Sequence, residues 1–184
     1  MDFSNTPIEG LLVLTPRVFA DNRGYFFESY NKNTLAALGI DANFVQDNES
    51  FSAKNTLRGL HFQKPPFAQA KLVRVLEGIV WDVAVDLRAG SPTFGKWFGV
   101  ELSAENKKQF FIPRGFAHGF AVRSQTAKFA YKCDNFYNKT SEGGILFNDP
   151  DLAIDWKIDL TQAVLSEKDL KNNSFQTYKG NPCF

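Results

Sequence analysis

The chain has 184 residues, 43% hydrophobic and 22% charged, so it can bury one substantial core and is too short for two ordinary domains. Its 21 Lys and Arg residues balance 20 Asp and Glu residues, which excludes an overall positive charge of the kind that attracts nucleic acid or acidic membranes. Residues 1–8 (MDFSNTPI) lack a signal-peptide pattern, and two cysteines are too few for a disulfide framework. We therefore expect a soluble, cytoplasmic protein with one domain over residues 1–184 and with no nucleic-acid or membrane partner.

Short apolar runs separated by turn-forming residues predict many strands. Aromatic residues make up 15% of the chain, including 19 Phe, and such residues favour strands. In the clearest run, IVWDVAVDLR at 79–88, we expect one face to pack in the core and the other to carry Asp82 and Asp86. Many short strands without repeats are typical of a two-sheet jelly roll or a closed barrel. In chain order, strands are expected at 8–15, 24–30, 44–52, 57–63, 71–76, 79–88, 96–103, 109–112, 116–123 and 127–133.

Helices are expected to be few and short. Asn33 fits the N-cap of a helix over 34–38 that Gly39 would terminate. Ser166, with Asp169 three residues later, fits a capping box near the end of the chain. Neither helix is long enough to change the prediction of a β fold.

The first of two histidines, His61, lies in TLRGLHFQ and is a candidate general base. If the strands at 57–63 and 71–76 pair as a hairpin across the two consecutive prolines, His61 and Lys71 can meet inside the barrel. A neutral imidazole suits proton abstraction near neutral pH, and a fixed ammonium stabilises an enolate oxygen. Taken alone, His61 equally fits a structural imidazole and Lys71 a solvated surface lysine.

Two tyrosines and the second histidine add further candidates. His118 lies in IPRGFAHGF, beside glycine like His61. Tyr131 shares a strand face with Cys133, and a phenol with a pKa of about 10 suits a group that gives a proton to a carbanion. Tyr137, at a strand end, could stack on a flat base or pack at the rim. Buried strand tyrosines are also common core residues.

Three cations could bind a diphosphate, namely Arg23, Arg58 and Lys168, although each alone is typical of an exposed charge. Strict alternation places Arg58 on the strand face opposite His61. The two can share a site only if Gly59 marks a bulge, or Arg58 serves elsewhere.

The residues around His61 argue against a metal site. Metal sites in barrels of this type usually begin with two histidines two apart on one strand, whereas Gly59 and Gln63 flank His61 here. The chain also lacks a P-loop, a GxGxxG turn, a CxxC pair and a serine-nucleophile elbow. These residues therefore disfavour a metal site, and no common nucleotide-binding or redox motif is present.

Taken in order, these segments resemble the dTDP-4-dehydrorhamnose 3,5-epimerase family. The resemblance runs from FADNRGYFFESY at 19–30 to NDPDLAIDW at 148–156, through VQDNES, TLRGLHFQ, KLVRVLEG, VWDVAVDLR, SPTFGKWFG, IPRGFAHGF and YKCDNFY. The PxGxxH within IPRGFAHGF also resembles the second cupin motif. The resemblance implies an all-β, cupin-type jelly-roll barrel with a few short helices. It also implies inversion of C3 and C5 of dTDP-4-dehydro-6-deoxy-D-glucose, in dTDP-L-rhamnose biosynthesis, without a cofactor or metal.

The same resemblance implies roles for individual residues. His61 would be the base, oriented by Asp169, although a capping box would explain Asp169 without catalysis. Tyr131 would be the acid on the opposite face of the sugar. Lys71 would stabilise the enolate at the C4 oxygen, and His118 would line the site. The positions implied to hold the nucleotide and its diphosphate are Arg23, Glu28, Gln46, Asp47, Asn48, Arg58, Glu142 and Lys168, with Tyr137 stacking on thymine.

Family resemblance further implies a homodimer in which an early strand reaches the partner's barrel, so that Arg23 and Glu28 serve the neighbouring site. Three alternatives remain open. The first is a mono-epimerase or a 3,4-ketoisomerase on the same dTDP-4-keto sugar, which needs the same base. The others are a non-catalytic sugar-nucleotide-binding barrel and a metal-dependent cupin. His61 together with Tyr131 favours epimerisation with proton delivery to both faces.

Overall fold

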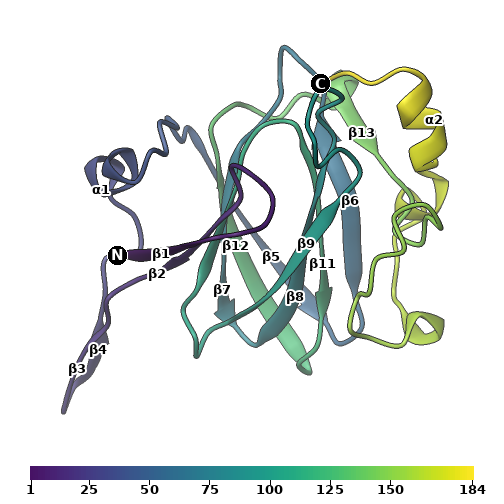
Figure 1. The fold of residues 1–184 in the computed structure, drawn as a ribbon. Helices are drawn as coiled ribbons and strands as arrows, with labels where there is room; N and C mark the ends of the chain where they lie inside the picture. The colour runs from purple at the N-terminus through teal and green to yellow at the C-terminus, as the bar shows by residue number, and fades with distance from the viewer.

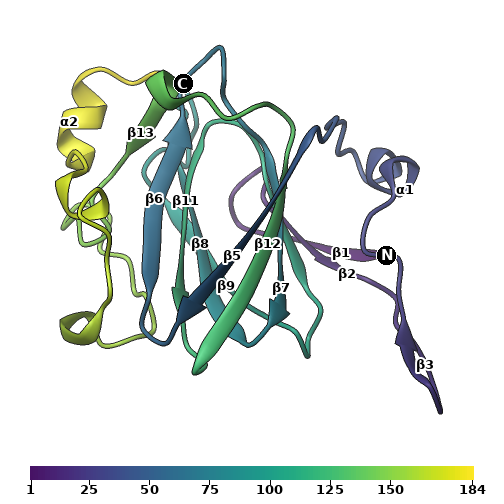
Figure 2. The same cartoon turned by 180° about the vertical axis from the view of Figure 1, so that it is seen from behind.

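Two antiparallel sheets face each other and form a barrel (Figures 1 and 2). The structure, a computed structural model, describes residues 1–184. The six-stranded sheet has the order β1 (Asp2–Asn5), β2 (Leu12–Thr15), β10 (Gln109–Ile112), β7 (Lys71–Glu77), β12 (Thr126–Cys133) and β5 (Gln46–Ala53). The five-stranded sheet has the order β13 (Glu142–Gly144), β6 (Leu57–Gln63), β11 (Phe116–Val122), β8 (Ile79–Asp86) and β9 (Trp97–Ser103).

The all-β prediction is confirmed, and most expected strands occur close to their predicted bounds. The runs at 8–15 and 24–30 form only the shorter β2 and β4 (Gly24–Phe26). Sequence analysis missed β1, β13 and β3 (Phe19–Asp21). These three segments are mostly polar or exposed and have no apolar alternation, so only their pairing partners make them strands.

The structure contains two large hydrophobic clusters, one on each side of the five-stranded sheet. Val80 and Ala84 of β8 pack in the barrel interior, whereas Val83 and Val85 pack on the outer side, under residues 145–184. This corrects the expectation that only one face of 79–88 lies in the core. The C-terminal segment covers the second face (Figure 1), and Trp156 anchors it with 1% exposure and an Nε1–H that donates to the Phe147 carbonyl at 2.8 Å.

The expected hairpin between 57–63 and 71–76 is wrong. β6 and β7 lie in opposite sheets, and the proline-containing link crosses from one sheet to the other. The physical reason is that neither strand has a free edge: β6 pairs with β13 and β11, and β7 pairs with β10 and β12. His61 and Lys71 can therefore meet only across the barrel, not along one sheet.

Short helices flank the barrel. The first, α1 (Lys32–Ala37), has Asn31 rather than Asn33 as its N-cap, because the Asn31 side chain accepts bonds from the amides of Asn33 and Thr34. The expected terminator Gly39 follows with φ +81°. The other helices are η1 (Lys139–Ser141), η2 (Leu160–Gln162), η3 (Asp169–Lys171) and α2 (Phe175–Gly180). None of the helices has the length and apolar character needed to cross a membrane.

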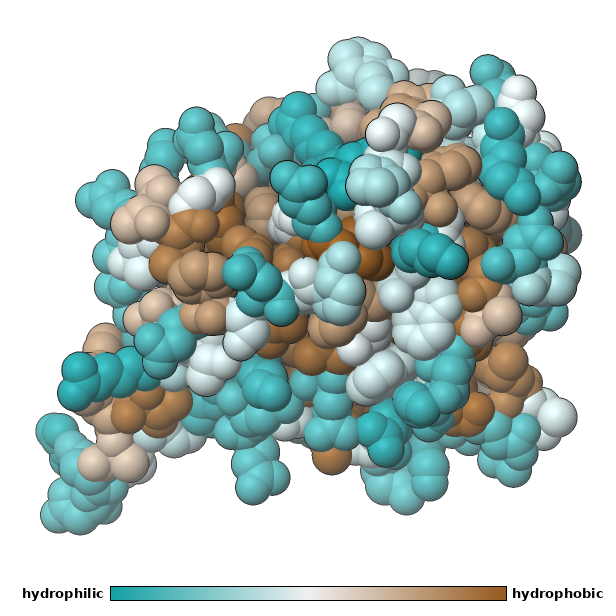
Figure 3. All heavy atoms as spheres, in the orientation of Figure 1, coloured by the Kyte–Doolittle hydropathy of each residue, from teal (hydrophilic) through white to brown (hydrophobic).

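The β3–β4 hairpin projects from the barrel as an arm (Figure 1), and its tip is hydrophilic (Figure 3). Phe19, Tyr25 and Phe26 of the arm are 53%, 61% and 70% exposed. So many exposed aromatic side chains on one short hairpin are unusual for a protein surface, because their burial stabilises a fold or an interface.

Candidate functional site

A cavity of about 320 Å³ opens at the end of the barrel where β6 and β12 finish and β5 and β7 begin. Side chains from both sheets line it, with His61 on one wall and Lys71 and Tyr131 on the other. Three residues that the sequence analysis placed on different strands therefore converge. The other lining residues are Gln46, Asn48, Phe62, Gln63, Gln69, Cys133, Tyr137, Glu142, Gly143 and Lys168.

His61 and Asp169 form a hydrogen-bonded pair, with 2.5 Å between Nε2 and Oδ1. The imidazole is 37% exposed towards the cavity, while the carboxylate is 4% exposed. Asp169 is fixed by Ser166, whose hydroxyl donates to Oδ2 at 2.7 Å and accepts from the Asp169 amide. Burial would raise the pKa of Asp169, but the hydrogen bonds from His61 and Ser166 outweigh it, so the pKa is lowered. The Ser166–Asp169 contact of the predicted capping box is present, but η3 begins at Asp169 with Lys168 rather than Ser166 as its N-cap. Asp169 is also the partner of the candidate base.

A bulge at Gly59 puts His61 and Arg58 on the same face of β6, although Arg58 does not line the cavity and donates its Nε–H to the Ser52 hydroxyl at 3.1 Å. In the register of β6 against β11, His61 pairs with His118 and Arg58 pairs with Phe120, so β6 has one extra residue. Gly59 has φ +137°, and a Cβ there would lie 2.5 Å from the Gly119 Cα, so only glycine fits. The extra residue reverses the alternation, which resolves the conflict between Arg58 and His61 in favour of a shared face.

The opposite wall carries the candidate acid and the candidate cation. The Lys71 Nζ lies 5.7 Å from the centre of the Tyr131 ring. Burial lowers the pKa of Lys71, although Cys133 and Asp82 oppose it. Burial also raises the pKa of Tyr131, with the Arg58 charge acting in the other direction. The Tyr131 phenol therefore keeps its proton at neutral pH and can act as a donor.

His118 lies deeper than expected and does not line the cavity. Its imidazole is 8% exposed, and its Nε2 lies 3.0 Å from each carboxylate oxygen of Asp82. Sequence analysis placed Asp82 on a strand face but missed this pairing. The alternation of 79–88 was the available signal, since it puts Asp82 on the face that turns out to be the barrel interior.

Most residues implied to bind the nucleotide lie at the cavity mouth. Lys168 and Glu142 form an ion pair at 2.6 Å, and the Gln46 side chain accepts the Tyr137 backbone N–H at 3.0 Å. Tyr137 is 54% exposed, so its ring is free to stack. Together with Asn48, which also lines the cavity, these residues give the mouth both charges and a flat aromatic surface.

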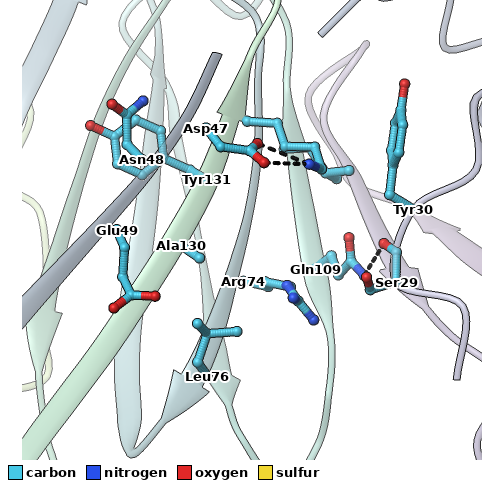
Figure 4. A pocket seen from close by; sticks show the side chains of 12 residues that line it. Ser29, Tyr30, Asp47, Asn48, Glu49, Arg74, Leu76, Gln109, Ala130 and Tyr131 are labelled. Atoms are coloured by element: carbon cyan, nitrogen blue, oxygen red, sulfur yellow. Dashed lines mark hydrogen bonds and ion pairs between the residues drawn. The ribbon is translucent and has the colours of Figure 1, made fainter. Parts of the chain in front are cut away.

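Asp47 lies outside the cavity, on the outer face of the six-stranded sheet. There it pairs with Lys132 at 2.8 Å, beside a second depression of about 350 Å³ (Figure 4). The depression is bordered by Ser29, whose carbonyl accepts a bond from Gln109 at 2.8 Å, and by Tyr30. Tyr131 also borders this depression, but His61 and Lys71 do not, so we assign the chemistry to the barrel cavity.

The structure does not bring Arg23 or Glu28 to the cavity of the same chain. Arg23 lies beyond the β3 strand, at the arm tip, and pairs with Asp21 at 2.6 Å. Glu28 accepts a bond from Asn31 at 3.0 Å, near the start of α1.

The fold and the cavity together define a cupin-type barrel enzyme of the acid–base class, with a histidine–carboxylate base on one wall and a phenol and an ammonium on the other. No group of three His, Cys, Asp or Glu side chains is arranged to hold a metal ion. Independence from metals stays a prediction.

Comparison with known proteins identifies the family. The sequence model described as dTDP-4-dehydrorhamnose 3,5-epimerase matches residues 5–177. The epimerase of Escherichia coli K12 is 54% identical over 170 residues, which are 92% of this chain and 91% of that protein. The crystal structure of the enzyme from Elizabethkingia anophelis superposes with a TM-score of 0.94 at 58% identity, covering 97% of this chain and 98% of that one. The Legionella pneumophila enzyme in complex with dTDP-4-keto-L-rhamnose gives a TM-score of 0.93 at 49% identity, covering 100% and 98%. The chain belongs to the dTDP-4-dehydrorhamnose 3,5-epimerase family.

Proposed function

We propose that this chain inverts C3 and C5 of dTDP-4-dehydro-6-deoxy-D-glucose to give dTDP-4-dehydro-L-rhamnose, a step in dTDP-L-rhamnose biosynthesis. The observation that carries the proposal is the placement of His61 and Tyr131 on opposite walls of one cavity. Inversion needs a proton removed from one face of a carbon and delivered to the other. Family membership supports this substrate over other keto sugars.

His61 is the general base in this proposal. The C3 and C5 protons are both α to the C4 ketone, so their removal places the electron pair on the C4 oxygen as an enolate. His61 takes the proton and becomes an imidazolium, which the adjacent Asp169 carboxylate stabilises. The Lys71 ammonium stabilises the enolate oxygen, where the negative charge develops.

Tyr131 completes each inversion. Its phenol gives a proton to the enolate carbon from the face opposite His61, the C=C bond becomes a C–C bond, and the ketone reforms. The phenolate then recovers a proton while the imidazolium loses one, through solvent at the open mouth of the cavity. The same cycle at the second carbon yields the doubly inverted product.

The mouth residues bind the nucleotide part. Arg58 and Lys168 attract the diphosphate, and Tyr137 stacks on thymine. Gln46 holds the Tyr137 backbone in place, while Glu142 keeps Lys168 directed towards the mouth. Asn48 adds amide hydrogen-bonding groups on the same side.

A homodimer completes the site in this proposal. The exposed aromatic residues of the arm need a cover, and Arg23 and Glu28 lie away from their own cavity. The arm of one subunit would reach the barrel of its partner, and the outer sheet face around Asp47 (Figure 4) would lie in the interface. The other members of that face include Tyr30, Glu49, Leu72, Leu76 and Ala130.

Mixing two inactive variants tests this arrangement. A heterodimer of Arg23→Ala and His61→Ala chains contains one intact site if the arm serves the partner, so random mixing restores about a quarter of the wild-type activity. If each arm serves its own barrel, every site has one defect and the mixture stays inactive.

Product analysis tests the reaction itself. The purified chain is incubated with dTDP-4-dehydro-6-deoxy-D-glucose, and the proton couplings of the product are read by NMR. Inversion at both C3 and C5 supports the proposal. Inversion at one carbon, or migration of the ketone to C3, moves the chain to the mono-epimerase or ketoisomerase alternative.

A further inference from the structure

Gln63 is a buried polar side chain of the barrel cavity to which the proposed reaction gives no role. It follows His61 by two residues on β6, so the two side chains share a strand face, and it is 6% exposed. A buried carboxamide is costly unless its polar atoms are hydrogen-bonded. The partners of Gln63 therefore show which parts of the chain it holds in place.

Three hydrogen bonds join the Gln63 carboxamide to two loops at the cavity mouth. Its Nε2 donates to the Phe67 carbonyl at 2.8 Å and to the Phe136 carbonyl at 3.2 Å, while its Oε1 accepts the Asn138 backbone N–H at 2.7 Å. Two carbonyls on one side and an N–H on the other leave one orientation for the amide, because only the nitrogen can donate. Gln63 thus bridges the link between β6 and β7 and the segment 136–138.

Tyr137 lies between the two positions of this segment that Gln63 holds. The bond to the Phe136 carbonyl fixes the peptide group before Tyr137, and the bond from the Asn138 N–H fixes the peptide group after it. The Tyr137 N–H itself donates to the Gln46 side chain at 3.0 Å. Because the two flanking peptide planes define the backbone dihedrals of Tyr137, they also set the direction in which its side chain leaves the backbone. The residue is 54% exposed, so packing around the ring contributes little to that direction.

We infer that Gln63 is a positioning residue for nucleotide binding, because its carboxamide fixes both peptide groups around Tyr137 and so orients the ring as a stacking surface. The inference rests on the proposed stacking of Tyr137 on thymine. A surface that is already oriented binds a base with less loss of conformational freedom than a mobile one. Gln63 therefore acts through Tyr137 and on binding, rather than on the chemistry at the sugar.

Gln63→Leu keeps the approximate size of the side chain and removes all three hydrogen bonds. We expect the Kd for dTDP, measured by calorimetry without substrate, to rise at least about fivefold, which is within the range of base–aromatic stacking. In turnover, KM should rise while kcat stays within about twofold of the wild type, because stacking is equal in the ground state and the transition state. An unchanged Kd overturns the inference. A fall in kcat alone also overturns it, since Gln63 would then act on His61.

A double-mutant cycle with Tyr137→Ala shows whether Gln63 acts through the ring. Tyr137→Ala should raise the Kd for dTDP by about tenfold. Adding Gln63→Leu should raise it no further, because the ring that Gln63 orients is absent. Losses that multiply in the double variant overturn the inference. If Tyr137→Ala alone leaves the Kd unchanged, the stacking in the proposed function is wrong and the inference falls with it.

Inorganic pyrophosphate separates the base from the diphosphate. Glu142, the ion-pair partner of Lys168, lies opposite Gln63 in the register of β13, so a variant at Gln63 could also disturb the cation. Pyrophosphate has no base, and its inhibition constant should stay within about twofold of the wild type in Gln63→Leu. Equal losses of affinity for pyrophosphate and dTDP would assign the effect to the diphosphate site and overturn the inference.

Gln69→Leu is the matched control. Gln69 lines the same cavity and donates one bond to the next part of the same loop, the Asn135 carbonyl, at 2.7 Å. Asn135 has a second anchor, because its own side chain donates to the Pro66 carbonyl at 3.1 Å. The rise in Kd for dTDP should be smaller than in Gln63→Leu and should not depend on Tyr137. A rise that is as large and equally dependent on Tyr137 would mean that any bond to this loop has the same effect, and it would overturn the inference.

If Gln63→Leu does not fold, Gln63→Glu takes its place in the cycle. A carboxylate still accepts the Asn138 N–H but cannot donate to the Phe136 carbonyl, so it releases the peptide group before Tyr137. The Kd for dTDP should again rise in the wild-type background and not in Tyr137→Ala. An unchanged Kd, or losses that multiply, overturn the inference as they do for Gln63→Leu.

Discussion

Two histidine–carboxylate pairs lie at different depths, and their histidines are on neighbouring strands of one sheet. His61 and His118 are Cα partners across β6 and β11. The outer pair has an imidazole that is 37% exposed and Asp169 as its partner, whereas the inner pair has an imidazole that is 8% exposed and Asp82 as its partner. The residue types are the same, so their surroundings must determine what each pair does.

Depth decides which of the two imidazoles can exchange protons with its surroundings. The outer imidazole reaches both substrate and solvent, so it can accept a proton and release it again. Burial lowers the pKa of the inner imidazole, His118, and a proton taken up there would have no route to the sugar. We therefore propose the outer pair as the base, whereas the inner pair stays buried behind it.

Removing the outer imidazole should have the largest effect. His61→Asn should reduce proton exchange at C3 and C5 by about a thousandfold or more, because it removes the general base. Exchange is measured by deuterium uptake, and dTDP binding should stay nearly intact. His118→Asn is the matched control and should retain measurable exchange. Comparable losses of exchange in both variants would contradict the claim that the two histidines have different roles.

Tyr131→Phe should have the second largest effect, and it should reduce inversion much more than proton exchange. Inversion should fall by roughly a hundredfold, because the opposite face loses its proton donor. Exchange should fall much less, since His61 can still remove a proton and return one to the same face. Equal losses of inversion and exchange would assign Tyr131 a structural role or a role in forming the enolate.

Asp169→Asn should slow exchange by roughly a hundredfold, because an amide cannot stabilise the imidazolium as a carboxylate does. Ser166→Ala provides the control, since it keeps the carboxylate and removes only one of its hydrogen bonds. Its rate loss should be smaller. If Asp169→Asn changes thermal stability but not the exchange rate, Asp169 acts only as a helix-terminal residue.

Asp86→Asn should have the smallest effect and should alter stability alone. Burial would raise the pKa of Asp86, but bonds from Arg88, Ser91 and Thr93 lower it from 3.8 to about 2. That shift corresponds to roughly 2 kcal/mol of unfolding free energy, present above the unfolded-state pKa and lost as pH falls through the folded-state value. Denaturant unfolding between pH 7 and pH 2 should show this loss in the wild type and a flatter dependence in the variant.

The sequence predicted features that depend on local alternation. The strand positions and the Ser166–Asp169 contact follow from local patterns. The convergence of His61, Lys71 and Tyr131 was implied by the resemblance to the family, since the hairpin that was expected to join His61 and Lys71 is wrong. The open question about Arg58 was resolved by the bulge at Gly59, which the sequence could suggest but not establish.

Features that depend on distant partners were missed. The pairing of β6 and β7 was wrong because strand edges are filled by segments far away in the chain. The second face of β8 is buried because the C-terminal segment covers it. Polar residues surround the few large buried side chains of that segment, such as Trp156, so the sequence pattern did not reveal them. The link between His118 and Asp82 required the register of two strands, which no pattern within either strand defines.

The most direct test is to incubate the purified, EDTA-treated protein with dTDP-4-dehydro-6-deoxy-D-glucose in D2O and to follow C3 and C5 by NMR. We predict deuterium at both carbons, inversion of both in the wild type, and loss of label in His61→Asn. Label at one carbon alone would contradict the double epimerisation. Absence of label in the wild type, with the nucleotide sugar still bound, would contradict the assignment of His61 as the base.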